Sequence, residues 1–316
     1  MTQTVASWYS ADMRTLRSVM FFFAAGVVSM SLSAQIPRDP VVQDQPRANV
    51  EFPGGSAELK IPIGTTRVNA LMYGAQGAGA HPTVVLLHGF PGNERNLDFA
   101  QALRRAGYNA LYFNYRGSWG SGGAFSFGGA REDVAAVLAF LRDPANAKRY
   151  GIDPNRISLL GHSMGGWLAL ASLGDDPKTQ CAVVLAPWDV GTFGTLLESG
   201  RFPPSEVVKA LQSYVDPEAG PLRGTTIETL IAEARQNAGA WTLAALAPSL
   251  QSKRGFVVVS SQDQAASPDM AHASLETALR GQRWQFHKID DDHGFSHHRI
   301  AIARSIVKWL NANCAK

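Results

Sequence analysis

The segment 157–167 constrains the fold more than any other part of the sequence. It opens with the apolar run Ile157–Leu160, passes through Gly161–Gly165 with the sequence GHSMG, and continues with helix-like apolar spacing. The pattern G-x-S-x-G is typical of a sharp turn from strand to helix that holds a serine hydroxyl above a sheet. Glycine suits both flanks because such a turn leaves little room for a Cβ atom. The segment predicts Ser163 as a nucleophile; the alternative is a chance glycine–serine turn.

Short apolar runs alternate with helical periodicity along most of the chain. Gly64-Thr65 joins the first two runs, which predicts an antiparallel hairpin at the edge of a sheet. Strands are expected at 57–63, 66–73, 83–88, 108–115, 156–160, 181–186, 255–260 and 284–289, and helices at 97–106, 133–141, 164–173, 270–279 and 295–310. This alternation predicts right-handed βαβ units and a mostly parallel sheet flanked by helices.

A long segment separates two of the expected strands. Residues 188–250 show helical patterns at 205–214 and 226–238, with prolines between them. Plain connections in such folds take only a few residues, so we expect 188–250 to be a helical cap inserted at the carboxyl edge of the sheet. Residues 35–55 are rich in Pro, Gln, Asp and Arg and are expected to be an extended linker that leads into the main domain, 56–316.

The first 34 residues differ in character from the rest. Arg14 and Arg17 precede the apolar run 19–28, and small residues follow up to Ala34. This order is typical of a secretory signal peptide, and the apolar run is short for a transmembrane span. We therefore predict residues 1–34 to be a signal peptide cleaved after Ala34, and the protein to be exported, either periplasmic or secreted. The alternative is an uncleaved membrane anchor.

Composition and cysteine content narrow the class of protein. A hydrophobic content of 45% with 17% charged residues is typical of a globular protein with a substantial core. The net charge is only +3 and no dense Lys/Arg run occurs, so nothing suggests a nucleic-acid partner. Of the two cysteines, Cys181 lies in an apolar run and looks like a buried strand residue, while Cys314 is near the end of the chain. We expect two free thiols, with a disulfide as the alternative that export permits, and neither has metal-ligating neighbours.

A second motif follows the strand that ends at Leu87. Residues 88–92 read His-Gly-Phe-Pro-Gly, and together with 161–165 they resemble the α/β-hydrolase family over about 55–313. The resemblance implies the α/β-hydrolase fold. It also implies that the backbone N–H groups of Phe90 and Met164 form an oxyanion hole, the pair of donors that stabilises a carbonyl oxygen during acyl transfer. His88 is expected to be structural, because this family places its catalytic histidine last in the chain.

The same family order, serine then acid then histidine, directs the search for the acid. Asp263 lies in the loop after the apolar run 256–259 and is the first choice. Relatives often carry a glycine where this chain has Ser260, which weakens the match. Asp269 is the rival.

The base is expected just before the last helix. His293 matches the His-x-Phe segment of the family, with Phe295 two residues later. His297 and His298 are expected on a solvated face at the start of that helix. The carboxylates of 290–292 are too near in sequence to reach the Nδ1 atom of His293 easily.

Three further side chains lie near the expected site. Arg116 follows a strand in a loop that resembles the Y-R-G-x-G-x-S loop of relatives, and is expected to make structural hydrogen bonds, with Asp133 as a candidate partner. Trp119 and Trp188 are candidates for substrate binding, and core or cap packing is the alternative for both.

These residues predict a serine hydrolase that needs no cofactor or metal and acts on a small ester. Ser163 would attack a carbonyl, His293 would move the proton, and Asp263 would orient the histidine, giving an acyl-enzyme that water resolves. The alternative is an exported serine peptidase or aminopeptidase, for which the acidic group that holds the substrate amine would come from Glu198, Glu206 or Glu218. A third reading is a non-catalytic binding protein on the same fold. The oligomeric state is not predicted.

Overall fold

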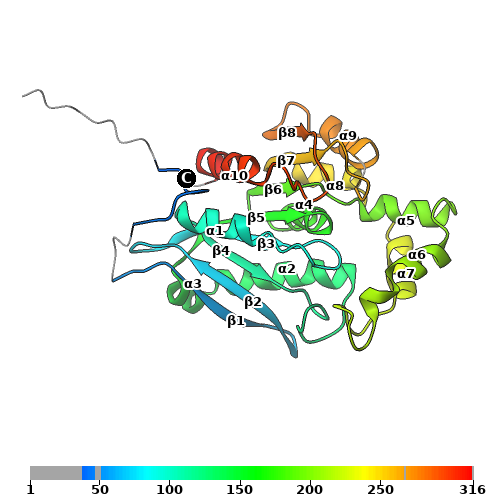
Figure 1. Cartoon of the computed structure of the whole chain (residues 1–316), viewed down its shortest axis with the longest axis horizontal. Coiled ribbons are helices and arrows are strands. Elements are labelled where there is room, and N and C mark those ends of the chain that lie inside the picture. The colour runs from blue at the N-terminus through cyan, green and yellow to red at the C-terminus, as the bar shows by residue number, and fades with distance from the viewer. Residues whose placement is uncertain (1–37, 47–50, 267, 315–316) are drawn as a thin grey trace, which may run out of the picture. The chain divides into compact units, whose positions relative to one another are not determined.

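A computed structural model describes residues 38–46, 51–266 and 268–314, without the side chains of 268–272 (Figure 1). The predicted signal peptide lies outside the described residues. No helix within the described part of the chain combines the length and apolar character needed to cross a membrane. Pro40 and Val41 lie near the start of the described chain. Their carbonyls accept hydrogen bonds from the Arg105 side chain.

Eight strands of the described residues form one sheet in the order β1-β2-β4-β3-β5-β6-β7-β8. The pairs β1–β2 and β2–β4 are antiparallel and all the other pairs are parallel, so the sheet is mostly parallel, as predicted. The strands are β1 Gly55–Ile63, β2 Thr66–Gly74, β3 His81–Leu87, β4 Asn109–Phe113, β5 Ile152–His162, β6 Cys181–Leu185, β7 Arg254–Ser260 and β8 Trp284–Ile289. The predicted hairpin joins β1 to β2, with Ile63 opposite Thr66.

Helices cover both faces of this sheet, and each face has its own core (Figure 1). The helices are α1 Leu97–Arg105, α2 Phe127–Arg142, α3 Pro144–Tyr150, α4 Met164–Asp175, α5 Val190–Glu198, α6 Pro204–Leu211, α7 Ile227–Gln236, α8 Leu243–Leu250, α9 Pro268–Ala278 and α10 Arg299–Asn313, with a 3₁₀ turn η1 at Gln212–Val215. Alternate residues of β7 point to opposite faces of the sheet. Phe256 and Val258 pack with α1 and α10, whereas Val257 and Val259 pack on the side of α2 and α4.

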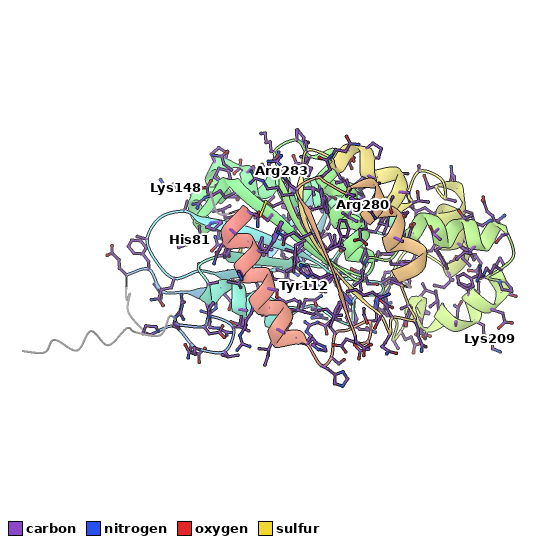
Figure 2. All side chains as sticks on the ribbon, turned by 90° about the horizontal axis from the view of Figure 1, so that it is seen from above. His81, Tyr112, Lys148, Lys209, Arg280 and Arg283 are labelled. Atoms are coloured by element: carbon purple, nitrogen blue, oxygen red, sulfur yellow. A yellow bond between two sulfur atoms is a disulfide. The ribbon has the colours of Figure 1, made fainter. Side chains whose placement is uncertain are left out.

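The segment 188–250 contains α5, α6, η1, α7 and α8 between β6 and β7. Figure 1 shows α5, α6 and α7 together beyond the end of the sheet, and in Figure 2 Lys209 of α6 lies at the opposite end of the view from Lys148 of α3. The carboxylate of Glu233 on α7 accepts hydrogen bonds from the N–H groups of Phe127 and Gly128 at the start of α2. These bonds attach α7 to the main domain.

The predicted elements mostly agree with the observed ones, but three helices were missed, α3, α5 and α8. Another helix starts earlier than predicted. We expected it from 133, and α2 begins at Phe127 because the Ser126 side chain accepts the N–H of Gly129 and Glu233 satisfies the two preceding N–H groups. These contacts compensate for glycines that disfavour a helix by themselves.

The expectation of two free thiols is wrong. Cys181, the first residue of β6, forms a disulfide with Cys314, which follows α10, and their Cα atoms lie 6.1 Å apart. Both side chains are buried, so burial of Cys181 was predicted correctly while its partner was not. The pairing depends on where α10 ends over the sheet, and no local pattern contains that information.

Candidate active site

The turn between β5 and α4 presents Ser163 in an unusual backbone conformation. Ser163 has φ 57° and ψ −123°, a region that L-residues rarely adopt. The flanking glycines permit it, because a Cβ on Gly161 would overlap the carbonyl of Gly165, and a Cβ on Gly165 would overlap the carbonyl of Leu87. The Ser163 N–H donates to the carbonyl of Leu185 on β6, which ties the turn to the sheet.

The loop after β3 runs directly beside this serine. A Cβ on Gly89 would lie only 2.9 Å from the Cβ of Ser163, so only glycine allows the backbone to pass there. Within the described residues, neither the N–H of Phe90 nor that of Met164 donates a hydrogen bond. Met164 is the first residue of α4, where backbone N–H groups have no partner inside the helix and favour negative charge.

Asp263 and His293 are joined by a hydrogen bond. The Nδ1 atom of His293 lies 2.7 Å from Oδ2 of Asp263, whose side chain is fully buried, whereas 27% of the His293 side chain is exposed. The other oxygen of Asp263 accepts the N–H groups of Ala265 and Ala266 at 2.8 and 2.7 Å. These bonds hold the carboxylate in the loop after β7. The side chain of the rival acid, Asp269, is not among those that the structure describes.

His162 connects the histidine loop to the serine turn. Its Nε2 atom donates to the backbone carbonyl of His293 at 2.8 Å, and the two rings lie 4.7 Å apart. Burial lowers the pKa of His162 to about 4, so the ring is neutral at ordinary pH. Since His162 directly precedes Ser163, this bond fastens the loop that carries His293 to the serine turn. Sequence reasoning missed it.

Asp291 organises the loop that carries His293. Its buried carboxylate accepts the N–H groups of Asp292 and His297, and contacts Nδ1 of His297 at 3.0 Å and of His298 at 2.8 Å. Burial disfavours ionisation of Asp291, but these hydrogen bonds outweigh it and hold its pKa well below the usual range. His297 is exposed, as predicted, yet it is paired, which was not predicted.

Asp291, Asp292 and His297 also form the one group of described residues whose ligand atoms all lie within 4.8 Å of one another, close enough to hold a metal ion. Asp292 and His297 are exposed, and the Asp291 carboxylate is already surrounded by N–H donors. We therefore infer that this cluster stabilises the loop, and we assign no metal to it.

The remaining candidates lie around the same turn. Arg116 pairs with Asp133, as expected, through its backbone N–H at 2.7 Å and its guanidinium. Trp119 donates its indole N–H to the carbonyl of Pro91 at 2.9 Å, so it buttresses the loop 88–92. The backbone N–H of Trp188 donates to the carbonyl of Ser163 at 3.0 Å, and its ring lies 6.3 Å from that of Phe90. Trp188 thus contacts Ser163 directly through the backbone, whereas Trp119 contacts the loop 88–92.

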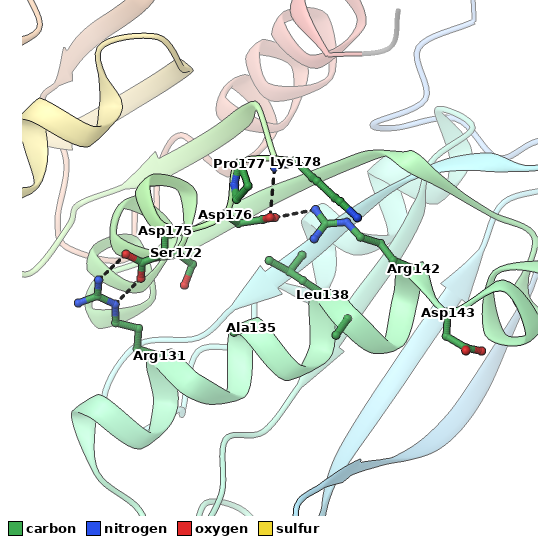
Figure 3. Close-up of a pocket in the computed structure, with 11 residues that line it drawn as sticks. Arg131, Ala135, Leu138, Arg142, Asp143, Ser172, Asp175, Asp176, Pro177 and Lys178 are labelled. Atoms are coloured by element: carbon green, nitrogen blue, oxygen red, sulfur yellow. Dashed lines mark hydrogen bonds and ion pairs between the residues drawn. The ribbon is translucent and has the colours of Figure 1, made fainter.

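The pocket in Figure 3 lies at the other end of α4. It has a volume of about 630 Å³ and is bordered by the ion pairs Arg131–Asp175 and Arg142–Asp176 (Figure 3). Ser163 precedes the first residue of α4 and Asp175 is its last, which separates them by roughly 18 Å along the helix. This pocket is not part of the candidate active site.

Comparison with known proteins shows the family and the fold. The model of the Alpha/beta hydrolase family matches residues 84–299, so the chain belongs to that family. An uncharacterized 31.7 kDa protein of Escherichia coli, from the traX-finO intergenic region, is 33% identical over 134 residues, 40% of this chain and 45% of that protein. The match therefore spans less than half of that curated relative's length.

Solved structures share the fold at low sequence identity. The Pyrococcus furiosus esterase Pf2001 superposes with a TM-score of 0.58 at 18% identity, covering 86% of this chain and 96% of that one. The Pyrococcus horikoshii acylaminoacyl peptidase gives a TM-score of 0.59 at 15% identity, over 84% of this chain and 42% of that one. At such identities the similarity supports the fold alone.

Proposed function

We propose that this protein is a serine hydrolase that cleaves carboxylic esters through an acyl-enzyme, with Ser163 as nucleophile, His293 as base and Asp263 as the acid that orients it. The observation that supports this proposal best is the 2.7 Å hydrogen bond between Asp263 and His293, on a loop that His162 bonds to the serine turn. An orienting acid, a base and a strained serine turn are the parts that acyl transfer needs.

In the first half of the reaction, Ser163 Oγ attacks the ester carbonyl and the Nε2 atom of His293 accepts its proton. Among the described residues Ser163 Oγ makes no hydrogen bond. A hydrogen bond between a catalytic serine and its histidine often forms fully only when substrate binds. Negative charge then develops on the carbonyl oxygen, where the unpaired N–H groups of Phe90 and Met164 would stabilise it. Asp263 keeps Nδ1 protonated and stabilises the imidazolium.

In the second half, His293 returns its proton to the alcohol oxygen as the carbon–oxygen bond breaks. The acyl group remains on Ser163. Water, deprotonated by His293, attacks this second ester, and collapse of the tetrahedral intermediate releases the carboxylic acid and restores the serine hydroxyl. The helices of 188–250 are proposed as the cap that controls access, with Trp188 and Trp119 beside the substrate.

The peptidase alternative has less support. An aminopeptidase needs an acidic side chain near the serine to hold the substrate amine, and the three carboxylates suggested for this role, Glu198, Glu206 and Glu218, are all exposed on or beside the cap helices. The curated relatives include cutinases, matched over only 19% of this chain, and an acylamino-acid-releasing enzyme. By these names, the relatives include both ester-cleaving and peptide-cleaving enzymes.

The test is a panel of p-nitrophenyl esters and aminoacyl-p-nitroanilides with wild type, Ser163→Ala and Asp263→Asn. Ser163→Ala is expected to abolish turnover and labelling by a fluorophosphonate, and Asp263→Asn to lower kcat about 10⁴-fold. Asp175→Asn removes an exposed carboxylate at the far end of α4 and is the control with unchanged activity. Ester turnover by Ser163→Ala would refute the mechanism, anilide turnover above ester turnover would favour the peptidase, and no turnover or labelling of wild type would favour a binding protein.

Export also stays a prediction. An oxidising compartment would suit the disulfide between Cys181 and Cys314. Mass spectrometry of the mature protein should find an N-terminus at Gln35; a mature chain that keeps residues 19–28 would contradict signal cleavage.

A further inference from the structure

Four aromatic side chains from separate parts of the chain form a connected row beside Ser163; we call it the aromatic wall. Ring centroids are 5.7 Å apart between Tyr214 and Phe90, 6.3 Å between Phe90 and Trp188, and 5.0 Å between Trp188 and Phe193. All four rings are only partly buried, although they pack against the core. Separations of 4.5–7 Å with tilted or edge-on geometry are those that aromatic pairs prefer.

The wall starts at the proposed chemistry and ends at the surface of the cap. Phe90 belongs to the loop that passes beside Ser163, and Trp188 donates its backbone N–H to the Ser163 carbonyl. Phe193 lies on α5, and its ring is 6.2 Å from that of Phe202, which is 41% exposed. Ring contacts therefore connect Phe202, an exposed side chain of the cap, to the loop that passes beside Ser163.

Two carboxylates beside the wall already accept hydrogen bonds from backbone N–H groups. Asp189, next to Trp188, is buried and accepts the N–H groups of Thr192 and Leu243 at 2.8 and 3.1 Å. Glu233 accepts two N–H groups at the start of α2. A substrate ammonium placed against the wall would lose hydration without gaining either carboxylate as a partner. A cation–π contact with one ring would return only about 1–2 kcal/mol, which is less than the cost of burying an unpaired charge.

We propose that the aromatic wall binds the apolar part of the substrate, so that the enzyme selects uncharged esters carrying an alkyl or aryl group and rejects those with an ammonium group at the same place. This inference rests on the proposed function, because it assigns the substrate class to the Ser163 site. It extends that function by giving Phe193 and Tyr214, which the sequence did not single out, a role in specificity.

The test compares kcat/KM for p-nitrophenyl acetate, butyrate, hexanoate and 6-aminohexanoate, and for a second series of acetate esters with longer alcohols. Wild type is expected to gain about four-fold in kcat/KM per methylene in one of the two series, the gain that follows from burying a methylene group. The series that shows the gain identifies the side of the ester that meets the wall. The 6-aminohexanoate is expected to react at least ten-fold more slowly than the hexanoate when the acid side meets it.

Trp188→Ala and Phe193→Ala are expected to lower kcat/KM for the longest ester at least ten-fold more than for the acetate. The matched control is Phe140→Ala, because Phe140 is also partly buried but packs against Tyr150, away from the site. It should leave the ratio unchanged.

Flat profiles in both series, or equal losses for all esters in Trp188→Ala and Phe193→Ala, would overturn the inference and leave the rings as cap packing. Either result is compatible with loss of acetate hydrolysis in Ser163→Ala, so failure of the wall and failure of the serine mechanism remain distinguishable.

Discussion

His162 shows how much one buried side chain contributes to this site. Its Nε2–H bonds the His293 carbonyl, and its Nδ1 atom is buried without a partner among the described residues. Protonation would place an N–H on Nδ1 where no acceptor lies. His88 is in a similar position, since its Nε2 atom is buried and unpaired, and burial lowers its pKa to about 4 as well.

These two histidines predict that acid destabilises the protein. In the unfolded chain each has its usual pKa of 6.5, against about 4 when folded. The unfolded state therefore binds more protons between these values. The stability due to the neutral rings is complete above pH 6.5 and is lost as the pH falls towards 4, by ~3 kcal/mol for each histidine.

Urea denaturation at pH 7.5 and 4.5 measures this effect. His162→Gln keeps an N–H donor but cannot titrate, so its free energy of unfolding should fall less on acidification than that of wild type. Equal losses in the two proteins would show that His162 does not contribute to the acid sensitivity.

At the scale of elements, α2 depends on α7. The first two N–H groups of α2 donate to Glu233, and the third N–H donates to Ser126, so a glycine-rich segment becomes helical. A carboxylate at a helix N-terminus is stabilising both as an acceptor and through the helix dipole. The same bonds hold the cap segment beside Phe127. The ring of Phe127 packs against two rings of the aromatic wall, Phe90 and Trp188.

Glu233→Ala is therefore expected to lower the free energy of unfolding by about 1–2 kcal/mol and to loosen α7. Urea denaturation measures the first effect, and faster limited proteolysis within 199–225 measures the second. Gln236→Ala, which removes an exposed side chain from the last turn of the same helix, is the matched control. If both variants behave alike, the Glu233 bonds do not anchor the cap.

At the scale of the whole molecule, the disulfide closes the domain. It links the start of β6 to the end of α10 across 133 residues, and both cysteines are buried. A cross-link over such a long loop restricts the unfolded chain strongly, which stabilises the folded one by ~5 kcal/mol in the chain-entropy view.

Thermal unfolding in the presence of a thiol reductant should consequently occur roughly 10 °C below unfolding without it. The double variant Cys181→Ser/Cys314→Ser should unfold near the lower temperature and should not respond to reductant. A wild-type protein with the same transition in both conditions would show that the disulfide is absent or without effect.

Local sequence determined most of the elements and the candidate residues, although α3, α5 and α8 were missed. The strand runs, the glycines around Ser163 and the His-x-Phe segment each carry their meaning within about ten residues, because periodicity and turn geometry are local properties. The family order then led from Ser163 to Asp263 and His293, whose Nδ1–Oδ2 distance is 2.7 Å.

Only the tertiary structure decided which distant groups meet. The pairing of Cys181 with Cys314, the bond from His162 to the His293 carbonyl and the engagement of Glu233 with α2 each join positions 70 or more residues apart. Such contacts depend on how helices pack over the sheet, and their energies come from burial and hydrogen-bond satisfaction that no short window of sequence contains.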